Sequence, residues 1–317
     1  MHGVTPYKIL AVDAAAHAVI IADGHSGEIL TELSFSPELS PTELIVTPDY
    51  AKAYLPCAST NGKNEILAVN LTCPAIYSLP MTIPYPAQFV LSAVSITTAY
   101  LAEPCGALHR LDLATMSSHN IGAPAIKASC VGLATDTERI YTAWEHYAGG
   151  TVMELDTNGD ISWQYDIAGI PTNIILADSR LIVPFTNTAF TGEGIALFNL
   201  NKRTSPVVVM IQCPSCPSSL AAYPCHAAVA ADKQTAYIVN EDGASIFVIN
   251  LVTAQIVDRL AIGRSLSRLY LIPDTDLAIG TSNLFADLTL IDLAGGALLA
   301  VTNTERQLLS NIAILLE

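Results

Sequence analysis

The chain has 317 residues, with 14 Lys and Arg against 29 Asp and Glu, which gives a formal net charge of −15. Apolar residues make up 51% of the sequence and charged residues only 14%, which excludes a disordered chain and allows a large buried core. The small number of basic residues argues against nucleic-acid binding, because phosphate contacts need clustered Lys and Arg.

Targeting and membrane signals are absent from the sequence. The uncharged stretch 213–231 contains Pro214, Pro217 and Pro224, so it does not resemble a membrane span and we expect no membrane insertion. The N-terminus lacks a basic segment followed by an apolar one, so no signal peptide is visible. This favours the cytoplasm, unless the chain is the mature form of an exported protein.

A repeat with a period of about 45 residues runs through the whole chain. Each unit contains a short β-rich run that ends in Asp or Asn, then a turn, then another β-rich run. In chain order, the runs end at Asp23, Asn70, Asp112, Asp156, Asn199, Asn250 and Asp292. Companion strands precede them at 9–12, 53–55, 99–101, 140–142, 181–183, 236–239 and 277–279.

Most companion strands are themselves preceded by a further apolar run, so each unit is expected to hold four short strands, A to D in chain order. A four-stranded sheet cannot bury both faces alone, but sheets stacked around an axis bury each other's faces and leave only short edges. We therefore predict an all-β fold, a seven-bladed β-propeller of four-stranded antiparallel blades that forms a single domain over 1–317.

The two ends of the chain predict how the ring closes. The first unit has no A strand before its other strands, whereas the last unit is followed by an extra apolar run at 311–316. We predict that this run is the missing A strand and pairs with the N-terminal blade. A C-terminal helix from Thr304 is the alternative, because Leu308, Leu309, Ile312 and Leu316 also fit a helical spacing.

The sixth unit carries a resemblance to a known family. It contains Ala236-Tyr-Ile-Val-Asn240, followed by 245–253 and 255–263 in the same pattern. This unit resembles the repeat of the YVTN family of seven-bladed β-propellers, whose members include surface-layer and secreted propellers, YncE-like proteins, lactonase-like proteins and subunits of quinoprotein amine dehydrogenases. The resemblance implies the propeller fold and leaves the function open.

Strands alternate in direction, so the B–C loops and the D-to-A connections are expected on one face of the ring, where propellers of this kind usually place their sites. The alternative for any single residue is a solvated loop position. The binding-face candidates are His17, Glu103, Glu145, His146, Asn187, Glu241 and Asp242, with Cys57, Cys105 and Asn283 in the same loops.

The segment 213–226 is unusual, because it lies in the longest repeat spacing and contains Cys213, Cys216, Cys225 and His226. These residue types are zinc ligands, so a metal site is one interpretation. However, Pro217 follows the second cysteine and has no backbone N–H to donate to a thiolate. We therefore favour a disulfide between Cys225 and either Cys213 or Cys216, or free thiols, over a metal site.

Three functions remain open. A non-catalytic binding or scaffold propeller, with a protein or small-molecule partner and no cofactor, is preferred because no recognisable catalytic motif is present. The second is an enzyme or redox-complex subunit, lactonase-like or quinoprotein-associated, with its site on the face that carries cysteines and carboxylates. The third is a structural unit of a larger extracellular or surface assembly, so a protein partner or oligomer is expected in either non-enzymatic case.

Overall fold

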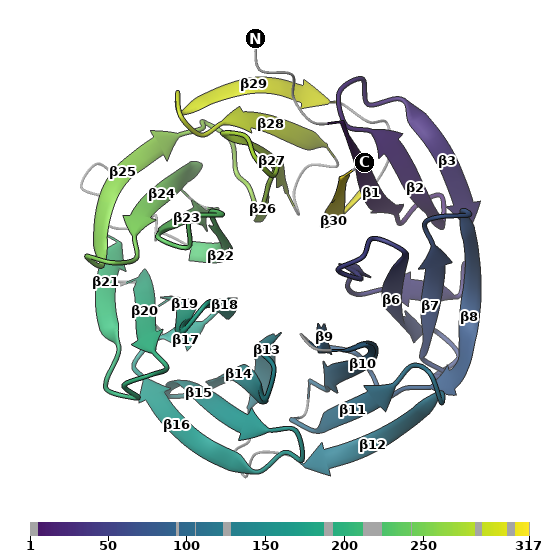
Figure 1. The fold of residues 1–317 in the computed structure, drawn as a ribbon, viewed down its shortest axis with the longest axis horizontal. Helices are drawn as coiled ribbons and strands as arrows, with labels where there is room; N and C mark the ends of the chain where they lie inside the picture. The colour runs from purple at the N-terminus through teal and green to yellow at the C-terminus, as the bar shows by residue number, and fades with distance from the viewer. Residues whose placement is uncertain are drawn as a thin grey trace.

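The computed structural model describes residues 6–92, 95–104, 106–122, 128–186, 193–211, 224–241, 243–282, 287–302 and 308–316. These residues form thirty strands and no helix, in seven antiparallel sheets around a central axis (Figure 1). The predicted seven-bladed β-propeller is therefore confirmed. Within the same ranges, no helix is long and apolar enough to cross a membrane.

The two inner strands of each blade lie nearest the axis. The innermost strands, A, are β30 (Leu308–Leu316), β4 (Leu39–Pro41) with β5 (Ile45–Val46), β9 (Gln88–Ser92), β13 (Ser129–Thr135), β17 (Ile170–Pro171) with β18 (Ile175–Ala177), β22 (Pro224–Val229) and β26 (Arg268–Leu271). The B strands are β1 (Tyr7–Asp13), β6 (Lys52–Ser59), β10 (Ser95–Ala102), β14 (Arg139–His146), β19 (Arg180–Thr186), β23 (Thr235–Asn240) and β27 (Leu277–Thr281).

The two outer strands complete each blade, and we number the blades from 1 to 7 in this order. The C strands are β2 (Ala18–Asp23), β7 (Glu65–Asn70), β11 (Leu108–Asp112), β15 (Gly149–Asp156), β20 (Glu193–Asn199), β24 (Ser245–Asn250) and β28 (Leu288–Asp292). The D strands are β3 (Ile29–Ser34), β8 (Ala75–Thr82), β12 (Ser117–Gly122), β16 (Ile161–Ile167), β21 (Val207–Ile211), β25 (Gln255–Ala261) and β29 (Ala297–Thr302).

The chain ends meet in blade 1, where β30 pairs antiparallel with β1 from Tyr7↔Leu316 to Ala11↔Ile312. The side chains of β30 alternate between two cores: Ile312 packs against blade 7, and Leu315 packs against blade 2. A strand buries both of its faces in this way, whereas a helix would offer only one apolar stripe. The predicted closure by a C-terminal strand is therefore right, and the alternative of a helix is wrong.

The Asp or Asn that marks each repeat has a structural role. In each of the seven units its Oδ1 accepts backbone N–H groups from the turn that follows strand C, as Asp112 does from Ala114 at 2.9 Å and Thr115 at 3.0 Å. These hydrogen bonds favour the carboxylate and hold the pKa of Asp112 below its usual value. The repeat signal read from the sequence is therefore turn chemistry.

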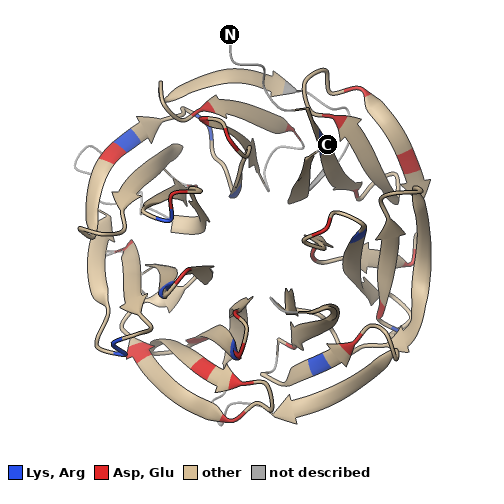
Figure 2. Cartoon of the chain, in the orientation of Figure 1, with Lys and Arg blue, Asp and Glu red and all other residues tan. Residues whose placement is uncertain are grey.

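The hydrophobic core is divided among the blade interfaces. The described residues form seven apolar clusters, and each cluster joins two neighbouring sheets. Trp144 of β14 is the largest fully buried side chain, and its indole N–H donates to Thr142 Oγ1 at 2.6 Å. Acidic side chains occur in all parts of the ring while Lys and Arg are few, in keeping with the net charge (Figure 2).

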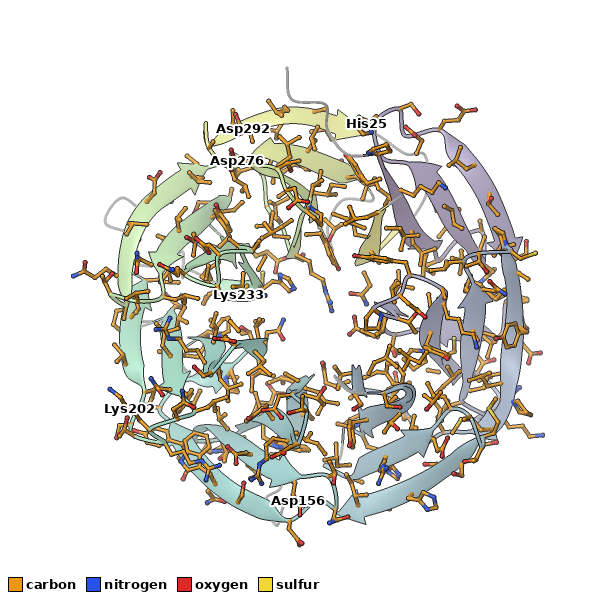
Figure 3. All side chains as sticks on the ribbon, in the orientation of Figure 1. His25, Asp156, Lys202, Lys233, Asp276 and Asp292 are labelled. Carbon is orange, nitrogen blue, oxygen red and sulfur yellow. The ribbon has the colours of Figure 1, made fainter. Side chains whose placement is uncertain are left out.

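The two faces of the ring carry different turns. The A–B and C–D turns lie on one face, and the B–C loops and D-to-A connections lie on the other. Figure 3 labels six residues of the first face, in or beside its A–B and C–D turns: His25, Asp156, Lys202, Lys233, Asp276 and Asp292. The polar starts of the A strands belong to the opposite face.

Candidate functional site

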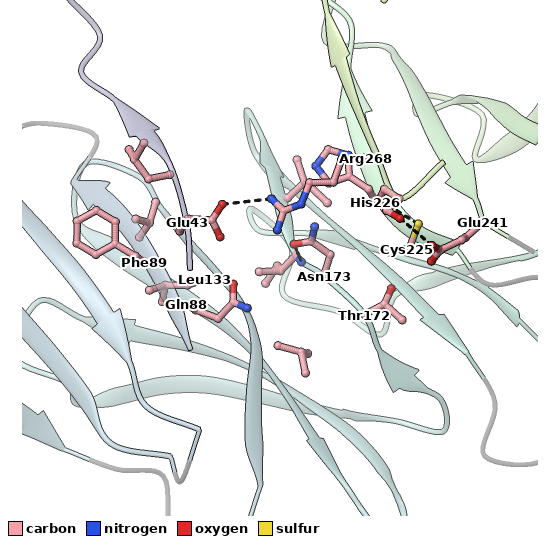
Figure 4. Close-up of a pocket in the computed structure, with 16 residues that line it drawn as sticks. Glu43, Gln88, Phe89, Leu133, Thr172, Asn173, Cys225, His226, Glu241 and Arg268 are labelled. Carbon is pink, nitrogen blue, oxygen red and sulfur yellow. Dashed lines mark hydrogen bonds and ion pairs between the residues drawn. The ribbon is translucent and has the colours of Figure 1, made fainter. Parts of the chain in front are cut away.

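An axial cavity of about 420 Å³ lies where the A strands begin, at the end of the axis that adjoins the B–C loops. Six of the seven blades contribute to its wall (Figure 4). Its most polar lining residues are Glu43, Gln88, Asn173, His226, Glu241 and Arg268. A concave site of this size with a few convergent polar groups is typical of small-molecule binding sites.

An ion pair crosses one side of this cavity. Arg268 of β26 donates from Nη1 to Oε1 of Glu43, between β4 and β5, at 3.2 Å (Figure 4). The side chains are 30% and 13% exposed, respectively. Burial raises the pKa of Glu43, although the guanidinium of Arg268 partly offsets this effect by stabilising the carboxylate. The pair joins blades 7 and 2, which flank the blade that closes the ring.

Several hydroxyl and thiol groups of the wall are used to join neighbouring blades. Thr172 Oγ1 donates to Pro224 O at 2.5 Å, and Ser267 Oγ donates to Glu241 Oε1 at 2.7 Å. Cys225 Sγ donates to Ser267 O at 3.2 Å. Burial raises the pKa of the Cys225 thiol, which keeps it protonated at neutral pH. These groups therefore stabilise the wall and are poorly suited to act as nucleophiles.

His226 of β22 is held as a neutral imidazole. Its Nδ1 accepts the backbone N–H of Leu269 at 3.4 Å, which places the ring proton on Nε2. Burial, together with the smaller effect of the positive charge of Arg268, lowers the pKa of His226 to about 3. The ring therefore joins blades 6 and 7 and can offer an N–H donor, but it has no free lone pair with which to act as a base.

The lowered pKa of His226 predicts that the protein loses stability as the pH falls below 6.5. The unfolded state takes up a proton there and the folded state does not, so unfolding becomes easier down to about pH 3. Urea unfolding at pH 7.5 and pH 5 measures how much the free energy of unfolding falls between the two pH values. This fall should be smaller in His226→Gln than in the parent, by up to about 2 kcal/mol. The control is His119→Gln, at an exposed position, which should lose as much stability as the parent. An equal loss in His226→Gln and the parent would contradict this prediction.

The structure separates the residues that the sequence placed together on the candidate face. Glu241 lines the cavity, at the start of the B–C loop of blade 6. His17 ends the loop after β1 and contacts Phe35, with ring centroids 6.1 Å apart. Glu103 contacts His109 Nε2 at 2.6 Å in blade 3. Neither His17 nor Glu103 lines the cavity.

Two further candidates end strand β14 in blade 4. His146 Nε2 lies 3.2 Å from Thr151 Oγ1, and neither His146 nor Glu145 lines the cavity. Cys57, expected in a loop, is instead buried within β6, because its repeat position falls inside strand B. Asn187, Asp242, Cys105 and Asn283 lie outside the described residues.

The proposed zinc or disulfide segment is only partly described. Cys213 and Cys216 lie outside the described residues, whereas Cys225 and His226 belong to β22. Cys225 is a free thiol in this structure, which is one of the two states expected for it. The disulfide stays a prediction, because both of its expected partners, Cys213 and Cys216, lie outside the described residues. The Cys225 thiol and the His226 ring both form hydrogen bonds with the backbone of blade 7, at Ser267 and Leu269 respectively. Among the described residues there is no group of three or more His, Cys, Asp or Glu that could hold a metal ion.

Four polar residues of the cavity wall were not among the candidates predicted from the sequence. These are Glu43, Gln88, Asn173 and Arg268, which lie at or near the starts of A strands, whereas most of the predicted candidates belong to loops. A signal was available in the sequence, because each of these four polar residues directly precedes the apolar inner run of its repeat, and the inner strands lie nearest the axis. Arg268 before Leu269-Tyr-Leu-Ile272 is the clearest example.

Comparison with solved structures agrees with the propeller fold. The chain is similar to Kuenenia stuttgartiensis hydrazine synthase, with a TM-score of 0.70 and 14% identity over 87% of this chain and 89% of that one. A functionally unknown protein from Desulfotomaculum acetoxidans DSM 771 gives a TM-score of 0.71 and 13% identity over 97% and 98%. Apo AztD from Citrobacter koseri gives 0.57 and 13% over 98% of both chains.

The class that the fold defines is thus the seven-bladed β-propeller. Identities this low show a shared fold alone and give no information about activity. No protein-family model matches the sequence, and no curated protein matches it.

Proposed function

We propose that this protein is a binding propeller that holds a small polar molecule in its axial cavity and performs no chemistry on it. The main support for this proposal is the cavity wall, where charged and amide groups from separate blades converge at the starts of the A strands. Rigid strands position such groups well for recognition. We further propose distant kinship to the YVTN-repeat propellers, supported by the sixth unit, and a protein partner on the same face.

The protonation states of the wall support binding over catalysis. A general base needs a free lone pair, and a thiol nucleophile needs a lowered pKa. His226 already accepts a backbone N–H, and burial raises the pKa of Cys225. Glu241 accepts the Ser267 hydroxyl. The donors and acceptors are thus fixed in place, which favours recognition of a ligand in one orientation.

A panel of small polar metabolites tests this proposal by ligand-observed NMR and isothermal titration. We expect one class of compound to bind, and Asn173→Leu to weaken its binding by about tenfold, because a buried amide contact is lost. Exposed Asn201→Leu is the matched control and should bind as the parent does. If no compound binds, or if both variants bind equally, the axial cavity is not the site.

An enzymatic role is the second candidate, favoured by the carboxylates in the cavity wall. In that case Glu241 is the carboxylate best placed to act in the cavity, since it lines the wall near Cys225 and Ser267. Turnover of the compound identified by NMR, lost in Glu241→Gln, would favour the enzyme. A compound recovered unchanged after long incubation would favour the binding protein.

A further inference from the structure

We propose that the ligand of the axial cavity is a small zwitterion of the α-amino-acid type, with its carboxylate on Arg268 and its ammonium group on Glu43. The ligand class rests on the proposed function, because it concerns the same cavity. Among the described lining residues, Arg268 and Glu43 place opposite charges side by side, while Glu241 already accepts the Ser267 hydroxyl. The described lining also holds the amides of Gln88 and Asn173 and no exposed Phe, Tyr or Trp ring, which favours this class over other small polar molecules.

The ion pair has unused capacity for a ligand. Only one contact joins the two side chains, Nη1 to Oε1 at 3.2 Å, and Tyr270 is a second neighbour of the guanidinium. A guanidinium carries five N–H donors in a fixed fork, so donors remain for a carboxylate. Arg268 is 30% exposed and reaches into the cavity (Figure 4).

Because the two protein charges lie close together, they favour a ligand whose own two opposite charges are a similarly short distance apart. In an α-amino acid the carboxylate and the ammonium group are bonded to the same carbon, so they too lie a few ångströms apart. Such a molecule can lie antiparallel to Arg268 and Glu43, with each charge beside its opposite. A simple anion would have to compete with Glu43, and a simple cation would be repelled by Arg268. Either would leave one partly buried charge without a partner, which is costly.

The remaining wall groups fit the same orientation. Asn173 Oδ1 accepts the N–H of Ile174 at 2.7 Å, so its Nδ2 is the end that can donate to a ligand carboxylate. Because the hydroxyls of Thr172 and Ser267 donate to protein groups, their hydrogens are not offered to a ligand. Besides the His226 imidazole, the described lining has one aromatic ring, that of Phe89, which is 4% exposed and offers no open face for stacking a sugar or a nucleobase.

The test uses the full-length protein and the common L-amino acids at millimolar concentration, with isothermal titration as the readout. For the best binder, two analogues separate the charges: the methyl ester, which lacks the carboxylate, and the acid that lacks the amine. We expect the zwitterion to bind at least about tenfold more tightly than either analogue, since each analogue leaves one charge unpaired.

Matched variants locate the site. Arg268→Gln and Glu43→Gln should each weaken binding by about tenfold or more, while Arg110→Gln and Glu28→Gln, exposed and outside the cavity, should not. Circular dichroism melts establish that each variant folds. If a variant fails to fold, the comparison of the zwitterion with its two analogues on the parent protein still tests the ligand class.

The outcomes distinguish the ligand class from the proposed function. An ester or amine-free acid that binds as tightly as the zwitterion overturns the ligand class. The ligand class is also overturned if no amino acid binds and a non-zwitterionic metabolite binds instead, with an affinity that depends on Asn173. In both cases the proposed binding function still holds. If neither an amino acid nor any metabolite binds, the ligand class and the proposed function both fail.

Discussion

Deletion of residues 308–317 is expected to prevent stable folding. The deletion removes β30, which is the innermost strand of blade 1 and pairs with β1 along its length. It also exposes the cores on both sides, because Ile312 is 3% exposed and Leu315 is 7% exposed in the intact ring. A propeller resists unfolding through closure, and an open blade leaves an unpaired edge next to apolar surface. Circular dichroism should show that cooperative melting is lost, and size-exclusion chromatography should show that the truncated protein aggregates.

Point variants of the same strand give a measurable version of this prediction. Ile312→Ala should lower the free energy of unfolding by about 2–4 kcal/mol, because it leaves a cavity between blades 1 and 7. Leu299→Ala on β29 is the control, since Leu299 is 52% exposed and its loss should cost no more than about 0.5 kcal/mol. Similar costs for the two variants, or a truncated protein that melts like the parent, would show that β30 does not close the ring.

Arg203→Ala is expected to cause the second large loss of stability, about 3 kcal/mol. Glu154 of β15 is 1% exposed and accepts Arg203 Nη2 and Ser162 Oγ, both at 2.7 Å. Arg203 belongs to the C–D turn of blade 5, so the ion pair joins two blades. Its removal leaves a buried carboxylate with only Ser162 and the more distant Arg139, at 3.7 Å. Urea unfolding of the variant measures the loss.

A double variant tests whether the buried charge is the cause. When Glu154 and Arg203 are both replaced by Met, no unpaired carboxylate remains, so stability should return to within about 1 kcal/mol of the parent. Exposed Arg110→Ala controls for the general loss of an arginine. A double variant that is less stable than Arg203→Ala would mean that the arginine acts mainly through its packing and not through its charge.

The sequence alone determined the architecture, because the signals of this fold are local and repeated. Asp112 and its counterparts mark the turn after strand C through hydrogen bonds that reach only two to four residues along the chain. The apolar run at 311–316 indicated closure because the repeat lacked one strand. Local turn chemistry and periodic apolar runs can be read without knowing what packs against them.

Only the tertiary structure decided which residues meet at the axis. Arg268 and Glu43 are far apart in the chain and belong to different blades, and no local pattern links them. The sequence assigned His17 and Glu103 to the correct loops, yet these loops lie away from the cavity. A ring brings together one position from each repeat, so its site depends on the direction and register of the innermost strands. Those are fixed by packing between blades, which is a property of the closed ring and not of any single repeat.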